Sequence, residues 1–136
     1  MIGEGPERAA VEAAAQGGRV AVLAPREDLS GLYAAADVFV LPSVSEGLSN
    51  ALLEAMASGL APLCSRVGGT AQTLEDGRTG LLFDKDDAAG LKAAARRLEA
   101  EPGLAARLGA AARAEVEARY AMDRLAARVE ELYRGR

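Results

Sequence analysis

Histidine is absent from this 136-residue chain, and cysteine occurs only once, as Cys64. The lack of histidine excludes Ser-His-Asp and Cys-His nucleophilic catalysis, and one cysteine without histidine argues against a structural zinc site. A single cysteine also excludes an intrachain disulfide, which favours a reducing compartment. Any chemistry of this chain therefore depends on carboxylates, hydroxyls, backbone amides and Arg or Lys side chains.

Aromatic residues are scarce, at 4% of the chain, and the formal net charge is -4 at pH 7. Both features argue against a nucleic-acid partner, which needs positive charge and stacking surfaces. No charge-free run reaches the roughly 18 residues of a membrane-spanning helix. The chain also starts without the basic segment and long apolar run of a secretory signal. With 50% hydrophobic residues, the sequence predicts a single cytoplasmic domain over residues 1–136.

Short apolar runs alternate with helical patterns along the chain. The runs typical of buried strands lie at 19–24, 37–41, 60–65 and 79–83, and Met1-Ile2 is the end of another. Helical patterns lie at 6–16, 28–36, 49–58, 70–75, 86–100, 104–120 and 122–133. The strand runs lack polar alternation, so we expect both faces of a parallel sheet to be covered. This order predicts an α/β fold, a parallel sheet with flanking helices and a C-terminal helical tail.

Two details of the helices are also predicted. Asp86 is expected to cap the helix that runs to Ala100. In the tail, five apolar residues recur at helical spacing and are expected to face the core. These are Leu104, Leu108, Ala111, Ala112 and Val116.

The segment after the strand at 37–41 has the composition of an anion site. In a parallel α/β sheet, ligands bind beyond the carboxyl ends of the strands. Here Pro42 and a short polar loop lead into a helix that Ser49 or Asn50 can cap. The free amides at such a helix start suit a phosphate, and Gly47 lets the backbone approach a ligand closely.

Two carboxylates flank this turn, Glu46 in the loop and Glu54 about one turn into the helix. Because helical side chains lean toward the N-terminus, both can face the same volume above the strand ends. Two carboxylates would repel a phosphate, but they suit hydroxyl groups, from which they accept hydrogen bonds. A ligand with phosphates on the amides and a diol on each glutamate would therefore fit, and a nucleotide sugar has this composition. On the residues alone, two alternatives stay open. Glu54 also fits a solvated residue on the helix surface. Glu46 also fits a loop carboxylate that caps nearby amides.

The stretch Asp37-Val-Phe-Val-Leu-Pro-Ser43, continued by Glu46-Gly-Leu-Ser-Asn-Ala-Leu-Leu-Glu54-Ala-Met-Ala-Ser-Gly59, strongly resembles the donor-binding domain of retaining glycosyltransferases with the GT-B fold. Those enzymes carry a Glu-x7-Glu signature, and Glu46 and Glu54 have that spacing. The resemblance extends to Gly3-Glu-Gly-Pro6, to Val67-Gly-Gly69 and to Glu75-Asp-Gly-Arg-Thr-Gly-Leu-Leu-Phe83. It implies a Rossmann-like sheet, one half of a GT-B fold, with the family's first strand missing.

The resemblance also implies roles for individual residues. Glu54 matches the glutamate that binds the nucleotide ribose, and Glu46 matches the one that faces the donor sugar and acts in catalysis. Backbone amides around Gly47, Leu48, Ser49 and Asn50 match those that hold the diphosphate. The loop Pro25-Arg26 follows the strand near the family's nucleobase pocket, although Arg26 also fits a surface arginine.

The mechanism implied by the resemblance needs no metal and no cofactor besides the nucleotide-diphospho-sugar. The departing phosphate takes the acceptor proton, and the hexose is transferred with retention of configuration. The family's N-terminal acceptor domain and its Arg/Lys pair for the diphosphate have no counterpart here. Arg66 is a candidate substitute for that pair, or a solvated loop arginine. A neutral pair, Ala71-Gln72, replaces the family's usual Pro-Glu.

The leading interpretation is therefore the sugar-donor-binding half of a retaining glycosyltransferase that is inactive or very weak alone. Its expected partners are a nucleotide sugar and either a missing acceptor domain or a second copy of the chain. The main alternative is a non-catalytic nucleotide-binding or interaction module that needs a partner chain. A nucleotide-sugar epimerase is a third interpretation, which the absent histidines and the Glu-x7-Glu context disfavour. Cys64 is expected to lie in the core, unreactive.

Overall fold

The computed structural model describes residues 1–2, 5–16, 20–120 and 134. The chain divides into two compact units, Met1–Leu32 and Tyr33–Arg136, and each is described by itself. The helix predicted at 122–133 lies outside the described residues.

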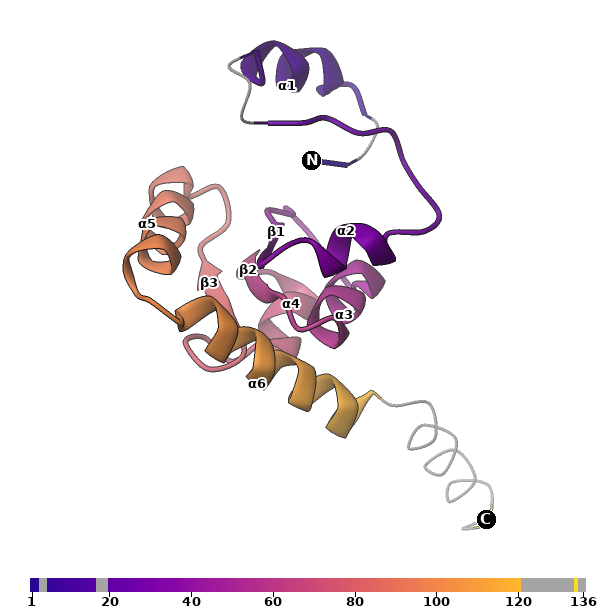
Figure 1. Cartoon of the computed structure of the whole chain (residues 1–136), viewed down its shortest axis with the longest axis vertical. Coiled ribbons are helices and arrows are strands. Elements are labelled where there is room, and N and C mark those ends of the chain that lie inside the picture. Colours follow the sequence, from indigo (N-terminus) through magenta and orange to yellow (C-terminus); the bar gives the residue numbers. More distant parts are fainter. Residues whose placement is uncertain (3–4, 17–19, 121–133, 135–136) are drawn as a thin grey trace. The chain divides into compact units, whose positions relative to one another are not determined.

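The first unit contains helix α1 (Arg8–Ala14) and a short parallel pairing of the chain start with residues near Leu23 (Figure 1). The Leu23 amide donates to the Met1 carbonyl at 2.8 Å, and Ile2 and Leu23 form an isolated bridge. The predicted buried strand at 19–24 is wrong, because its described residues form only this bridge. No described residue of this unit is buried, so it offers no core that could hold a longer ladder.

The second unit is built on a parallel sheet of three strands, β1 (Val38–Leu41), β2 (Ala61–Ser65) and β3 (Leu81–Phe83), in the order β1-β2-β3. Leu41 lies opposite Cys64, and Ser65 lies opposite Phe83, so the carboxyl ends of all three strands meet at one edge. This arrangement confirms the predicted α/β fold with a parallel sheet. It places the loops that follow the strands side by side.

The helices lie close to their predicted positions in the sequence. The structure contains α2 (Ser30–Ala34), α3 (Asn50–Ala57), α4 (Gly68–Thr73), α5 (Ala88–Ala100) and α6 (Leu104–Arg119). Helix α4 begins two residues before its predicted start. Its first turn is held by the Thr70 hydroxyl, which donates to the Ser65 carbonyl at 2.5 Å and accepts from the Val67 amide at 3.2 Å.

Helices cover both faces of the central strand β2, all of whose residues are buried. One cluster joins Ala61, Leu63, Leu81, Phe83, Leu104 and Leu108. The other joins Leu52, Met56, Cys64, Leu74 and Ala112. Of the five tail residues expected in the core, Leu104, Leu108 and Ala112 are buried and the other two are half-buried. For β1 the expectation of two covered faces holds only in part, since Val40 is 47% exposed while Val38, Phe39 and Leu41 are half-buried.

The N-cap of α5 is Asp87, so the prediction of Asp86 as the cap is wrong. The Asp87 side chain accepts a hydrogen bond from the Gly90 amide at 2.9 Å. A Cβ at position 90 would lie 2.3 Å from Asp87 Oδ2, so glycine there lets this carboxylate reach the helix end. Asp86 instead takes a left-handed conformation, with φ of 61°, and turns the chain into the cap.

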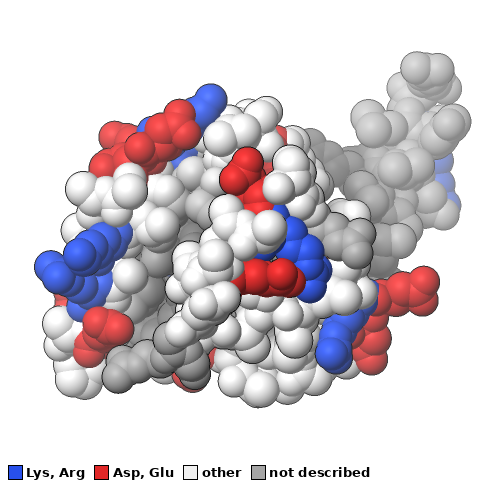
Figure 2. Space-filling view, turned by 90° about the horizontal axis from the view of Figure 1, so that it is seen from above, with Lys and Arg blue, Asp and Glu red and all other residues white. Residues whose placement is uncertain are grey.

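Positive and negative side chains are interspersed on the surface shown in Figure 2. Among the described residues, several charged side chains form ion pairs, such as Arg78 with Glu115 at 3.0 Å and Arg97 with Glu101 at 2.6 Å. Among the helices that the structure describes, none is long and apolar enough to cross a membrane.

Candidate functional site

The candidate site lies where β1 ends and α3 begins. Ser49 caps α3 as predicted, and its hydroxyl accepts from the Leu52 amide at 3.4 Å. In the described part of the chain, no hydrogen bond uses the amide N–H of Leu48, Ser49 or Asn50. These three donors lie at the positive end of the helix dipole, which is the arrangement that anions favour.

Glu46 is held in the loop by a serine of the same turn. The Ser43 hydroxyl donates to Glu46 Oε1 at 2.6 Å, and Glu46 is half-buried. The Ser65 hydroxyl, at the end of β2, donates in turn to the Ser43 carbonyl at 2.5 Å. Two hydrogen bonds, one to the main chain of Ser43 and one from its side chain, therefore connect the end of the central strand to the Glu46 carboxylate.

The same loop packs against the start of α4 so closely that only glycine fits there. A Cβ on Gly68 would lie 2.2 Å from the Glu46 carbonyl oxygen, and one on Gly69 would lie 1.7 Å from that of Gly47. The Gly69 amide donates to the Glu46 carbonyl at 2.9 Å. The two glycines thus fix the backbone of the loop that carries the candidate residues.

A pocket of about 440 Å³ opens beside this junction. Its lining comes from the loop after β1, from α4 and from the end of α6: Glu46, Gly47, Leu48, Gly68, Gly69, Gln72, Thr73, Arg119 and Tyr120. Arg119 lies over the Tyr120 ring, 5.4 Å from its centroid, and pairs with Glu115 at 3.2 Å. Sequence reasoning missed Arg119 and Tyr120, because no local motif links the end of a tail helix to a loop some 70 residues earlier.

Glu54 is exposed on α3 and is not among the residues that line this pocket. Its carboxylate accepts a hydrogen bond from the Tyr33 hydroxyl at 3.3 Å. Glu46 and Glu54 therefore have separate hydroxyl partners, Ser43 and Tyr33. Sequence reasoning missed Tyr33 as well, since the two residues of this bond are 21 positions apart.

The remaining three predicted site residues are Arg66, Pro25 and Arg26. The Arg66 guanidinium pairs with Asp76 at 2.9 Å and with Asp84 at 3.5 Å, so a phosphate would compete with two carboxylates for it. Pro25 and Arg26 belong to the first unit, where both are exposed. Their part in holding a nucleobase stays a prediction.

Cys64 is fully buried in the cluster beneath α3, as expected for a core residue. Burial raises the pKa of the Cys64 thiol from 9.0 to about 12, and the nearby Glu46 charge adds to the shift. The thiol therefore stays protonated and unreactive. In the described ranges, no group of three or more Asp, Glu or Cys side chains is placed to hold a metal ion.

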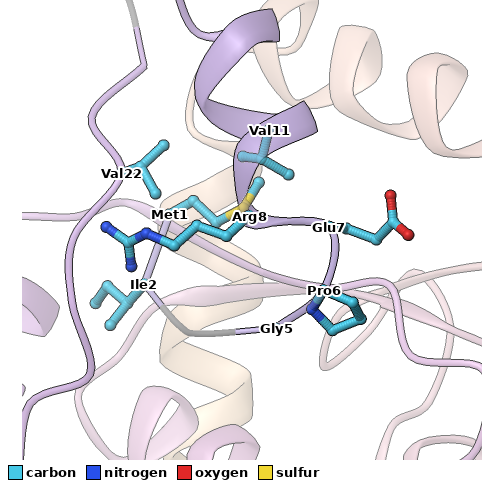
Figure 3. Close-up of a pocket in the computed structure, with 8 residues that line it drawn as sticks. All are labelled: Met1, Ile2, Gly5, Pro6, Glu7, Arg8, Val11 and Val22. Carbon is cyan, nitrogen blue, oxygen red and sulfur yellow. The ribbon is translucent and has the colours of Figure 1, made fainter.

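The first unit has a pocket of its own, with a volume of about 330 Å³. Figure 3 shows the apolar side chains of Met1, Ile2, Val11 and Val22 around it. The charged side chain of Arg8 also lines it, and this arginine pairs with Glu12 at 2.8 Å. The mostly apolar lining does not match the polar chemistry of the turn after β1.

Solved structures share the fold of the chain. Sucrose-phosphate synthase from Thermosynechococcus elongatus superimposes with a TM-score of 0.85 and 33% sequence identity, over 98% of this chain and 37% of that one. HepE from Anabaena, in complex with UDP, superimposes with a TM-score of 0.87 and 21% identity, over 99% of this chain and 40% of that one. The fold is therefore the Rossmann-like half of a GT-B glycosyltransferase, as the resemblance implied.

Sequence comparison gives the family. The family described as glycosyl transferases group 1 matches residues 1–101. D-inositol 3-phosphate glycosyltransferase from Streptomyces bingchenggensis is 34% identical over 108 residues, which cover 79% of this chain and 24% of that protein. This chain belongs to the glycosyl transferases group 1 family. It spans about a quarter of the length of such curated relatives.

Proposed function

We propose that the chain is the donor-binding half of a retaining glycosyltransferase, and that it binds a nucleotide-diphospho-sugar. In the complete enzyme, a hexose from this donor is transferred to an acceptor. One observation carries the proposal: in the described part of the chain, the turn from β1 to α3 has three amides without a hydrogen-bond partner, Glu46 precedes them in the sequence and Glu54 follows them, and each carboxylate accepts a hydrogen bond from a hydroxyl. This set of groups matches a ligand with a diphosphate at its centre and a polyol at each end.

Each group has one role in the proposal. The amides of Leu48, Ser49 and Asn50, beside Gly47, hold the diphosphate. Glu54 accepts from the ribose hydroxyls, and Glu46 accepts from the donor sugar, where it acts as the catalytic carboxylate. Crystal structures of HepE hold UDP and UDP-glucose, which supports the proposal that the shared fold takes a ligand of this chemical class.

The transfer step follows from the retaining chemistry of the family. The bond between the sugar C1 and the phosphate oxygen breaks, and the acceptor oxygen bonds to C1 on the same face. The acceptor proton passes to the departing phosphate oxygen, so no histidine base is required. We propose that the step is independent of metal and of any cofactor other than the nucleotide sugar.

The proposed domain spans residues 1–136, and full activity requires the acceptor-binding half. Transfer needs the acceptor and a cationic clamp on the diphosphate beside the donor, and positioning of this kind contributes a large share of catalysis. Arg66 is a weak candidate for that clamp, because two carboxylates already pair with it. We therefore expect this chain alone to bind the donor but to transfer sugar very slowly.

Calorimetric titration with UDP-glucose and with GDP-mannose tests the proposal. Glu54→Ala leaves a ribose diol without its acceptor, which costs roughly 1–3 kcal/mol, a tenfold to hundredfold loss of affinity. Glu99→Ala is the control, because Glu99 is an exposed glutamate of α5, away from the turn after β1. Its affinity should equal that of the wild type.

Equal affinity of the wild type and Glu54→Ala would remove Glu54 from the site. A strong requirement for added Mg²⁺ would contradict metal independence. Binding of free UDP or GDP as tightly as the sugar nucleotides, with no transfer after an acceptor half is added, would favour the alternative of a non-catalytic nucleotide-binding module.

A further inference from the structure

A tyrosine on α2 is bonded to one of the two carboxylates of the candidate site. Tyr33 Oη donates to Glu54 Oε2 at 3.3 Å. The Tyr33 ring packs edge-on against Phe39 of β1, with ring centroids 6.4 Å apart and planes at 67°. The half-buried tyrosine is thus packed against the sheet, and its hydroxyl reaches a carboxylate at the surface.

The chemistry of this pair fixes the direction of the hydrogen bond. Burial raises the pKa of the Tyr33 hydroxyl, and the charge and hydrogen bond of Glu54 raise it further. The phenol therefore keeps its proton through the neutral range and acts as the donor. An ionised carboxylate has about four lone-pair positions, so a carboxylate that accepts one hydrogen bond from Tyr33 can still accept from both hydroxyls of a diol.

We propose that Tyr33 is a positioning residue that orients Glu54 toward the ribose of a bound nucleotide and makes the site selective for ribonucleotides over 2′-deoxyribonucleotides. The inference rests on the proposed function, in which Glu54 binds the ribose. An exposed glutamate without a partner samples many rotamers, whereas the hydrogen bond from Tyr33 to Oε2 narrows the directions in which Glu54 presents its oxygens.

The selectivity follows from the way a fixed hydrogen-bonding site discriminates. A carboxylate oriented to accept from both ribose hydroxyls forms one hydrogen bond fewer with the 2′-deoxyribonucleotide, so it favours the ribonucleotide. A carboxylate without the Tyr33 bond loses more rotamer freedom when it forms these bonds, which reduces the gain. Tyr33 should therefore affect the affinity for the ribonucleotide more than that for the deoxyribonucleotide.

The test measures four dissociation constants on the same chain, for UDP, 2′-deoxy-UDP, GDP and 2′-deoxy-GDP. For the base that binds better, the wild type should prefer the ribonucleotide by about tenfold. Tyr33→Phe keeps the ring against Phe39 but removes the hydroxyl. It should lower this ratio to about threefold or less, through weaker binding of the ribonucleotide alone. Tyr33→Leu is a second variant without the hydroxyl, and its ratio should fall in the same way.

Ser58→Ala is the matched control. The Ser58 hydroxyl also donates to Glu54, but to its main-chain carbonyl at 2.8 Å, at the end of α3. Its removal takes away a hydrogen bond to the same residue without touching the carboxylate, so the ratio should stay at the wild-type value. A general loss of stability would act on both nucleotides and leave the ratio unchanged.

The two proposals fail in different ways. If Glu54→Ala abolishes the preference for the ribonucleotide but Tyr33→Phe and Tyr33→Leu keep it, Tyr33 is not a positioning residue and the ribose role of Glu54 stands. If the wild type shows no preference, or Glu54→Ala keeps it, Glu54 does not bind the ribose, and both the proposed role and this inference are wrong.

Discussion

The two glutamates of the candidate site differ in their surroundings, and this difference suits different tasks. Glu46 is half-buried and accepts a hydrogen bond from the Ser43 hydroxyl at 2.6 Å. The Ser43 carbonyl in turn accepts one from the Ser65 hydroxyl, at the end of the central strand, at 2.5 Å. Glu54 is exposed and receives a single longer bond, at 3.3 Å. The more constrained carboxylate is the one proposed to face the reacting sugar, where small displacements affect the rate most.

Cys64 gives a prediction about stability at alkaline pH. Its pKa is raised by burial to about 12 in the folded chain, against about 9 when unfolded, so the folded state retains a proton that the unfolded state loses. The contribution is constant below about pH 9 and falls as the pH rises from 9 toward 12. Between pH 9 and 10 the wild type should lose about 1 kcal/mol more unfolding free energy than Cys64→Ala.

Urea unfolding of both proteins at pH 8, 9 and 10 provides the measurement. Subtracting the variant removes the contributions of lysines and tyrosines that titrate in the same range. Parallel curves for the two proteins would mean that the thiol ionises as easily in the folded chain as in the unfolded one.

Among the elements, the contact between the loop after β1 and the start of α4 determines the shape of the candidate pocket. Gly69→Ala would place a Cβ 1.7 Å from the Gly47 carbonyl oxygen, and a backbone atom cannot yield as a flexible side chain does. We expect a loss of roughly 1–3 kcal/mol of unfolding free energy, as for other overpacked sites, together with weaker nucleotide binding. Thermal and urea unfolding measure the first effect, and calorimetry measures the second.

Gly31→Ala provides the comparison, because a Cβ at position 31 meets nothing within 4 Å. Gly31 lies in α2, where alanine is the better helix former, so this variant should be as stable as the wild type or slightly more so. Wild-type stability and binding in Gly69→Ala would show that the loop moves freely against α4.

The elements themselves were predictable from local patterns, and their partners were not. Strands β1 to β3 follow continuous apolar runs, and the Ser49 cap follows from one residue type at a helix start. The apolar run at 19–24 gave a wrong prediction of a buried strand, because hydrophobic content predicts burial only where other elements supply a core. The bonds from Tyr33 to Glu54 and from Ser65 to Ser43 join residues more than 20 positions apart, so they depend on packing that no short motif encodes.

At the scale of the whole molecule, the outer strand of the sheet exposes an apolar side chain. Among the described residues β1 pairs only with β2, and Val40 of this strand is 47% exposed, while Val44 in the loop after it is 62% exposed. An apolar edge strand is a template for pairing with another chain. We expect the chain to self-associate, which sedimentation velocity over a range of concentrations would detect as a rising average mass.

Val40→Lys places a charge on that strand and should shift the association to higher concentration. Val44→Lys is the comparison, because position 44 lies in the loop after the strand. It should change the self-association less than Val40→Lys does. A wild-type chain that stays monomeric at all concentrations would mean that the β1 edge is not available for pairing.

The central claim is that the turn from β1 to α3 binds the diphosphate of a nucleotide sugar, and backbone amide NMR tests it most directly. On titration of the ¹⁵N-labelled chain with UDP-glucose and with GDP-mannose, one of the two should shift the amide signals of Leu48, Ser49 and Asn50 most, because these N–H groups have no partner among the described residues. The amides of the second half of α5, residues 95–100, should stay in place, whereas its first turn lines a pocket with residues of the loop after β1. Shifts that centre on the second half of α5, or unchanged signals for all three residues with both donors, would contradict the account.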